Sequence, residues 1–143
     1  MKYYVFGKNF TFLNKPILDL LKDTIDYEYL GENVDLSKLP KDKDFYWILI
    51  LNPNILTINF KKFSKFVEEN KDKNIFVARK IKTFGCVIFK ENKQIDKFIV
   101  NKLYIFIGIL GVKRENLYPT MAETIKNLPK DNTAVYIQRK GEK

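Results

Sequence analysis

Residues 47–59, WILILNPNILTIN, decide the fold of this chain. Five consecutive apolar residues, 47–51, stop at the polar corner Asn52-Pro53-Asn54, after which a helix is predicted. A continuous apolar run of this length that ends at a turn is typical of a strand buried on both faces. In open α/β sheets, ligands bind just beyond the carboxyl ends of such strands. We therefore look for a site from Asn52 onward, where the sequence supplies amides and a proline but no ionisable group.

Strand and helix patterns alternate along the rest of the chain. Asn14 before Lys15-Pro16 is a helix-start signal, with an N-cap side chain and a proline in the first turn. Thr120 and Glu123 have the spacing of a capping box at the start of a later helix. The predicted strands are residues 2–6, 25–30, 47–51, 75–79, 84–89, 95–100, 103–112 and 134–138. The predicted helices are residues 14–23, 59–70 and 120–128, with one helical turn at 35–39.

The helix that ends at residue 70 is predicted to be amphipathic and to be capped by Thr57 or Asn59. Four apolar side chains share one of its faces, with lysines and glutamates elsewhere: Phe60, Phe63, Phe66 and Val67. We interpret the three phenylalanine rings as part of the core rather than as a base-stacking platform. The alternation of strands and helices predicts an α/β fold, a three-layer sandwich with a mostly parallel sheet. No linker or internal repeat divides it, so residues 1–143 are predicted to form a single domain.

Composition excludes several kinds of site. The chain has no histidine, which removes Ser-His-Asp and Cys-His catalysis and histidine metal ligands. Its one cysteine, Cys86, excludes an internal disulfide and a cysteine zinc cluster. The longest apolar run, residues 103–112, is about half the length of a membrane span. With no signal-peptide pattern at the start, we expect a cytoplasmic protein with no membrane partner.

The formal net charge of +9 raises the question of a nucleic-acid partner. Only Arg79, Arg114 and Arg139 are arginines, and lysines scattered along the whole chain supply nearly all of the positive charge. The clustered arginine forks that recognise phosphate most specifically are missing from the sequence. Solvated surface charge and a real anionic partner both remain open as explanations.

Several short phrases, in order along the chain, resemble those of one family. The phrases are LNKPIL at 13–18, YLG at 29–31, the central strand and turn at 48–56, FGCV at 84–87, IGI at 107–109 and the late helix at 120–130. Their order is similar to that in the sugar-1-phosphate nucleotidyltransferases. The resemblance implies a Rossmann-like mixed sheet and a reaction that joins a nucleoside triphosphate to a sugar phosphate with Mg²⁺. It also implies that Gly31 lets a nucleobase approach the backbone and that Asn54 stands where the family holds its metal.

The chain departs from this family at the positions that carry the chemistry. Only Gly7, Lys8 and Asn9 lie between the first strand and the next element, where the family has a glycine-rich loop and an arginine for the triphosphate. Asn54 replaces a metal-binding aspartate, and a neutral amide is a poor ligand for Mg²⁺. Of the sugar-binding phrase only Lys102 survives, and no second metal-binding aspartate is found before the end of the sequence.

We therefore predict a catalytically impaired relative with no catalytic or metal-binding residues, which acts as a nucleotide-binding or sugar-nucleotide-binding or regulatory subunit. Mg²⁺ is expected only if activity survives. A homo-oligomer or a partner subunit is expected, because a shortened core leaves apolar edges exposed. The candidate ligand-binding residues are Gly7, Lys8, Lys15, Gly31, Asn52, Asn54, Gly85, Lys102 and Gly108.

Each of these candidates also has a purely structural interpretation. Asn52 and Asn54 are common turn residues beside a proline, and glycines serve tight turns as well as ligands. A small basic nucleic-acid-binding protein is the alternative function. An active enzyme of reduced size, which uses carboxylates such as Asp26, Glu28 or Asp96, is a third hypothesis.

Overall fold

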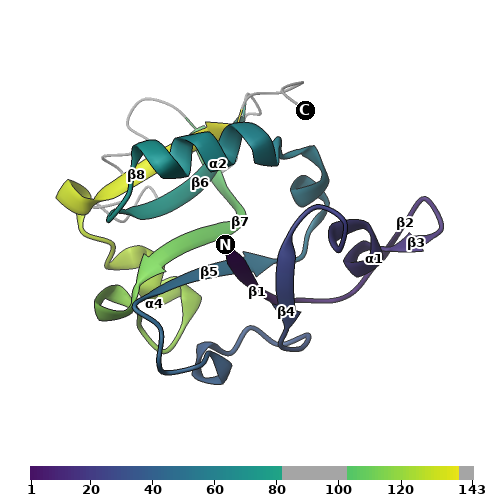
Figure 1. Cartoon of the computed structure of the whole chain (residues 1–143), viewed down its shortest axis with the longest axis horizontal. Helices are drawn as coiled ribbons and strands as arrows, with labels where there is room; N and C mark the ends of the chain where they lie inside the picture. The colour runs from purple at the N-terminus through teal and green to yellow at the C-terminus, as the bar shows by residue number, and fades with distance from the viewer. Residues whose placement is uncertain (82–102, 139–143) are drawn as a thin grey trace.

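The computed structural model describes residues 1–81 and 103–138 (Figure 1). The strands predicted at 84–89 and 95–100 lie outside the described residues, as do Gly85, Cys86 and Lys102. The chain forms a mixed α/β fold with a six-stranded sheet of order β4-β1-β5-β7-β6-β8. These strands are β1 (Lys2–Phe6), β4 (Asp26–Tyr29), β5 (Phe45–Ile50), β6 (Asn74–Ile81), β7 (Leu103–Lys113) and β8 (Thr133–Gln138).

The sheet is parallel except for one strand. β1 pairs parallel with β4 and β5, and β6 pairs parallel with β8, whereas β7 runs antiparallel to both of its neighbours. The prediction of a mixed, mostly parallel sheet is therefore confirmed. Helices are few and short, so the finer prediction of a three-layer Rossmann-like sandwich stays a prediction.

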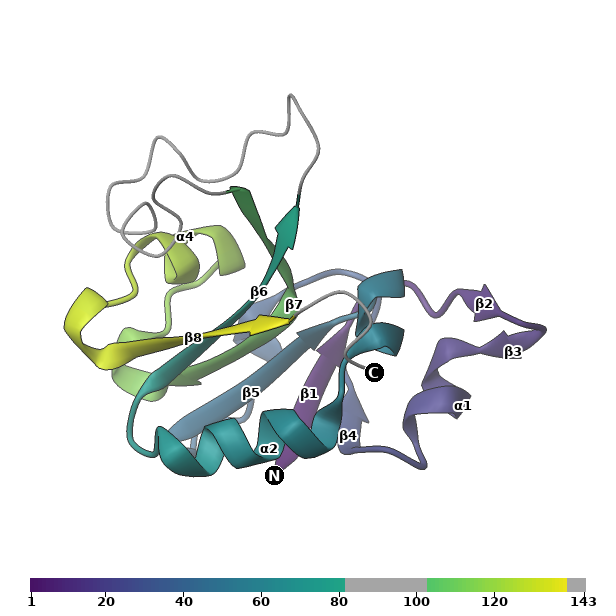
Figure 2. The same cartoon turned by 90° about the horizontal axis from the view of Figure 1, so that it is seen from above.

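Short helical elements lie against both faces of the sheet (Figure 2). One face packs on α1 (Ile17–Leu21), the 3₁₀ turn η2 (Pro53–Thr57) and α2 (Phe60–Glu69). The other packs on the 3₁₀ turn η1 (Leu36–Lys38) and α4 (Met121–Lys126). The remaining 3₁₀ turns, η3 (Arg114–Asn116) and η4 (Lys130–Asn132), flank α4 in the chain.

β5 is buried on both faces, as its continuous apolar sequence predicts. Alternate side chains enter the two cores, Trp47 and Leu49 on the α2 side and Ile48 on the α4 side. The Trp47 ring packs edge-on against Phe63 of α2, with the ring centroids 5.5 Å apart. Phe63 is fully buried, which confirms that this helix face belongs to the core. At the centre of the fold, α2 thus packs on β5 through aromatic contacts.

The caps of the two longest helices follow the sequence. Asn59, one of the two predicted caps of α2, accepts a hydrogen bond from Lys62 N at 3.1 Å. In α4 the Thr120 hydroxyl accepts from Glu123 N at 3.1 Å, as the capping-box spacing predicts. These side chains satisfy backbone N–H groups that have no partner within the helix.

The prediction of a helix over residues 14–23 is wrong in its first part. Residues 11–16 form a hairpin of two short strands, β2 (Thr11–Phe12) and β3 (Lys15–Pro16), which projects from the body of the molecule (Figures 1 and 2). Leu13 and Asn14 make its two-residue loop with φ of 52° and 67°, the conformation that two-residue hairpin loops require. Asn14 is therefore a loop residue, and α1 begins only after Pro16.

Tyr3 carries a buried hydroxyl that has no hydrogen-bond partner within the described structure. Its side chain is 1% exposed, and burial raises the pKa of its phenol above the ordinary value. Because the pKa of this phenol is higher in the folded than in the unfolded chain, its contribution to the free energy of unfolding is fully present at pH values below the unfolded pKa, near 10. That stability is lost as the pH rises above about 10, because only the unfolded chain then ionises.

We expect Tyr3→Phe to be as stable as the wild type or more stable at pH 7, since an unpaired buried hydroxyl is removed. The free energy of unfolding of Tyr3→Phe minus that of the wild type should grow by about 1.4 kcal/mol between pH 7 and pH 11. Urea denaturation at both pH values measures it, with Tyr118→Phe as the matched substitution at an exposed tyrosine. A wild-type hydroxyl that stabilises the fold by more than about 1 kcal/mol at pH 7 would contradict this account.

Candidate functional site

The carboxyl ends of the parallel strands meet at one edge of the sheet. β1 ends next to Gly7, while Gly31 and Asn52 follow the ends of β4 and β5, respectively, by two residues. β7 runs the other way and passes this edge near Gly108. The structure thus brings most of the predicted site residues to a single edge, the one where open α/β sheets bind ligands.

Asn52 is fully engaged in holding this edge together. Its Nδ2 donates to the backbone oxygens of Ile50 at 2.7 Å and Ile107 at 3.0 Å, which ties the end of β5 to β7. Its Oδ1 accepts from Asn54 N at 2.9 Å and caps η2. Both donor hydrogens of the amide and its oxygen are therefore in use, and the structural interpretation of Asn52 is the one that the geometry favours.

Gly108 is required by the same contact. Its φ is +104°, and a Cβ added to it would lie 2.4 Å from Asn52 Nδ2 and 2.7 Å from Ile50 O. Only glycine leaves room for the Asn52 amide to reach β7 and adopts this backbone conformation without strain. The position of Gly108 is thus explained by packing within the fold.

A backbone hydrogen bond between Gly7 and Gly31 joins the chain just after β1 to the chain just after β4. Gly7 N donates to Gly31 O at 2.9 Å, and the Tyr29 hydroxyl donates to Gly7 O at 2.7 Å. Gly31 has a φ of +120° and only the end of the Lys38 side chain near its missing Cβ, at 3.3 Å. The backbone at Gly31 is therefore approached by a flexible cation rather than by packed side chains.

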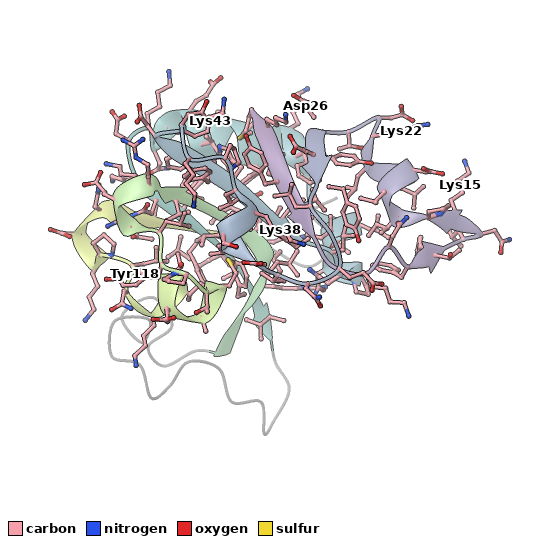
Figure 3. The ribbon with its side chains drawn as sticks, turned by 90° about the horizontal axis from the view of Figure 1, so that it is seen from below. Lys15, Lys22, Asp26, Lys38, Lys43 and Tyr118 are labelled. Atoms are coloured by element: carbon pink, nitrogen blue, oxygen red, sulfur yellow. The ribbon has the colours of Figure 1, made fainter. Side chains whose placement is uncertain are left out.

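The predicted lysines do not gather in one place. Lys8 is exposed immediately after β1, whereas Lys15 lies at the outer end of the projecting hairpin (Figure 3). Lys38 of η1, which the sequence analysis did not single out, lies nearer the middle of the molecule and donates to Leu30 O at 3.3 Å. Its only signal in the sequence is its place in the predicted helical turn after Gly31.

Arg79 is the second residue that sequence reasoning missed. It lies on β6 near the carboxyl end of the strand, and its Nη1 donates to Asn54 Oδ1 at 2.8 Å. The Asn54 amide thus faces a guanidinium. The two residues are 25 positions apart, and only the pairing of strands brings them together.

Thr57 and Gln138 form a second polar pair beside Arg79. Gln138 is the register partner of Arg79 on β8, and its Nε2 donates to both oxygens of Thr57. Thr57 Oγ1 in turn donates to Asn54 O at 2.7 Å within η2. Through Asn54 and Thr57, η2 is therefore hydrogen-bonded to the ends of both β6 and β8. Gln138 is 2% exposed, and its Oε1 has no hydrogen-bond partner within the described structure.

The residues at this edge do not fit a divalent cation. Asn54 Oδ1 is engaged with a positively charged guanidinium, and a metal placed there would meet like charge. Among the described residues, no three carboxylate or thiol groups lie close enough to hold a metal ion. We derive no step that depends on a metal.

The carboxylates of the third hypothesis lie elsewhere or outside the described residues. Asp26 stands at the amino end of β4, in register with Lys2, on the opposite edge of the sheet from Gly31. Glu28 forms an exposed ion pair with Lys2 at 3.1 Å. Asp96 is not among the described residues.

An apolar cavity of about 630 Å³ lies just beyond the end of β5, between the projecting hairpin and the start of α2. Leu56 and Ile58 line its inner wall and Phe12 and Leu13 its outer wall. A second cavity, of about 420 Å³, lies at the opposite edge of the sheet over Phe45 and Trp47. None of the residues that line these two cavities is among the predicted site residues.

Neither a family model nor a curated protein matches this chain. Within the described residues, no helix is both long and apolar enough to cross a membrane.

We expect Gly108→Ala to lower the free energy of unfolding by roughly 2–4 kcal/mol, because a methyl group meets Asn52 and the backbone at a strained φ. Gly31→Ala is the matched control, since it has a similar φ but meets only a mobile lysine end. Urea denaturation of both variants separates the steric cost from the cost of backbone conformation. Equal losses for the two would show that the Asn52 contact is unimportant.

Proposed function

We propose that this chain is a nucleotidyltransferase-like α/β domain, with a Rossmann-like sandwich around its sheet, that binds a nucleotide or a sugar nucleotide. We further propose that it does not transfer nucleotides and acts as a binding or regulatory subunit. The observation that carries the proposal is the junction of Gly7 and Gly31. Two neighbouring parallel strands are each followed there by a glycine; Gly7 packs against Leu51, whereas Gly31 has only the end of the Lys38 side chain near its missing Cβ and leaves backbone open to a flat ligand at the edge where such ligands bind.

Two further features support the same proposal. The sheet is mixed and mostly parallel, as the resemblance implies. Two cations lie on this edge, Lys38 at the end of β4 and Arg79 at the end of β6, with β1, β5 and β7 between them. The phosphate groups of a nucleotide need positive charge of this kind.

The proposal of impaired catalysis rests on Asn54. Transfer of a nucleotidyl group needs charge neutralisation at the reacting phosphate, which Mg²⁺ held by carboxylates supplies in the resembled enzymes. Here the corresponding side chain is an amide bonded to Arg79. The exposed side chains of Phe12 and Leu13 on the hairpin support a partner subunit or a second copy.

Isothermal titration against nucleoside diphosphates and sugar nucleotides tests the proposal. We expect binding in the micromolar range to at least one of them, and no product when a triphosphate and a sugar phosphate are added with Mg²⁺. Gly31→Val, which fills the proposed approach to the backbone, should weaken that binding at least tenfold. No heat with any of these ligands would refute the binding proposal, and product formation would refute the proposal of lost catalysis.

Nucleic-acid binding is the second candidate, and the charge of α2 favours it. Lys61, Lys62 and Lys65 are exposed on this helix, and the whole chain carries +9. If these lysines bind phosphates, the affinity for a single-stranded oligonucleotide should fall steeply between 0.05 and about 0.2 M salt. Changing all three to glutamine should flatten that dependence. Undetectable binding at about 0.15 M salt would exclude this function.

A further inference from the structure

We propose that Arg79 is the anion-binding residue of the site and that it binds the phosphates of the ligand without a divalent cation. This inference rests on the proposed function, since it names how the same site would hold the diphosphate of a nucleotide or sugar nucleotide. Three features of the described residues carry it: the place of Arg79, its neutral partner and the unsatisfied acceptor beside it.

The place of Arg79 follows from strand alternation. Ile75 and Val77 of β6 enter the core under α2, whereas Phe76 and Ala78 enter the core on the other face. Arg79 continues the first set, so its side chain emerges on the α2 face where β6 reaches the ligand-binding edge. There it meets Asn54 of η2 at 2.8 Å. A charged residue thus follows two buried apolar residues on this face of β6.

The partner of Arg79 orients it without neutralising it. Asn54 accepts one of the five N–H groups of the guanidinium through a neutral amide oxygen. Among the described residues no carboxylate pairs with Arg79, whereas Arg114 at the opposite edge pairs with Asp44 at 3.3 Å. A half-buried guanidinium with a fixed plane and an uncompensated charge is suited to bidentate binding of phosphate.

The same arrangement replaces a metal ion electrostatically. A divalent cation at the end of a strand supplies positive charge next to phosphate oxygens, and it needs anionic ligands of its own. Arg79 supplies a permanent positive charge there and needs only a neutral acceptor, which Asn54 is. The amide at position 54 thus orients the cation at position 79 and leaves its charge available to a phosphate.

The side chain of Gln138 places a hydrogen-bond acceptor that has no donor among the described residues at this corner of the sheet. It is in register with Arg79 and nearly fully buried, and its Oε1 has no partner in the described part of the chain. An unpaired buried acceptor costs about 1–3 kcal/mol, and a hydroxyl-bearing ligand supplies the missing donor. This favours a phosphate ester of a sugar over inorganic phosphate as the ligand class.

The test is isothermal titration with UDP-glucose and ADP, each in 5 mM EDTA and in 5 mM Mg²⁺, roughly millimolar conditions that saturate a typical magnesium site. We expect the wild type to bind equally under both conditions. Arg79→Gln should weaken binding at least about tenfold, because a charge-assisted bidentate contact is lost. Arg114→Gln removes an arginine at the far edge and should leave affinity unchanged. Denaturation curves of both variants establish that they are folded.

Asn54→Asp separates this proposal from a hidden metal site. A carboxylate next to Arg79 forms an ion pair and competes with the ligand, so we expect weaker binding that stays independent of Mg²⁺. Tighter, Mg²⁺-dependent binding in Asn54→Asp, or Mg²⁺-dependent binding in the wild type, would overturn the inference while the proposed function stands.

Titration with inorganic pyrophosphate keeps the two proposals distinguishable. Pyrophosphate binding that is lost in Arg79→Gln, without any binding of UDP-glucose or ADP, would support the anion site and refute the nucleotide function. Binding of the nucleotides at full strength in Arg79→Gln would refute the role of Arg79 alone.

Discussion

The rest of the structure depends on the contact between the Asn52 side chain and β7. Among the strands that the structure describes, β7 alone runs antiparallel to its neighbours, and it separates β5 from β6. The Asn52 side-chain amide links the end of β5 to Ile107 O of β7, and it also caps η2. The glycine at position 108 is the condition for it, because any side chain there would occupy the place of the amide. The geometry of this edge is thus set by a residue whose two side-chain N–H groups are both bonded to backbone oxygens.

The strands and the two longest helices follow from local patterns. Apolar runs predict β5 and β7, and caps at Asn59 and Thr120 define where helices begin, because both signals depend on neighbouring residues only. The hairpin is the exception. Lys15-Pro16 carries a valid helix-start signal, but Leu13 and Asn14 adopt positive φ and fold the chain back before the helix can start. A leucine in that conformation is uncommon, so the sequence holds no strong signal for it.

The candidate site was predictable as a location but not as a set of contacts. The rule that ligands bind at the carboxyl ends of parallel strands correctly brings together Gly7, Gly31 and Asn52 at one edge. Arg79 could not be found this way, because its strand reads as a simple apolar run and its partner Asn54 lies in another element. The register of β6 with β8, which adds Gln138 to the same corner, is likewise a property of the folded sheet.

The two asparagines at the end of β5 therefore have different consequences for chemistry. Asn52 satisfies backbone groups and makes the edge rigid, which any ligand site at the end of β5 requires. Asn54 instead presents its oxygen to a guanidinium. A carboxylate in its place would cancel the charge of Arg79, and an apolar side chain would leave the guanidinium without a fixed orientation. A neutral acceptor is the one choice that keeps Arg79 both oriented and fully charged.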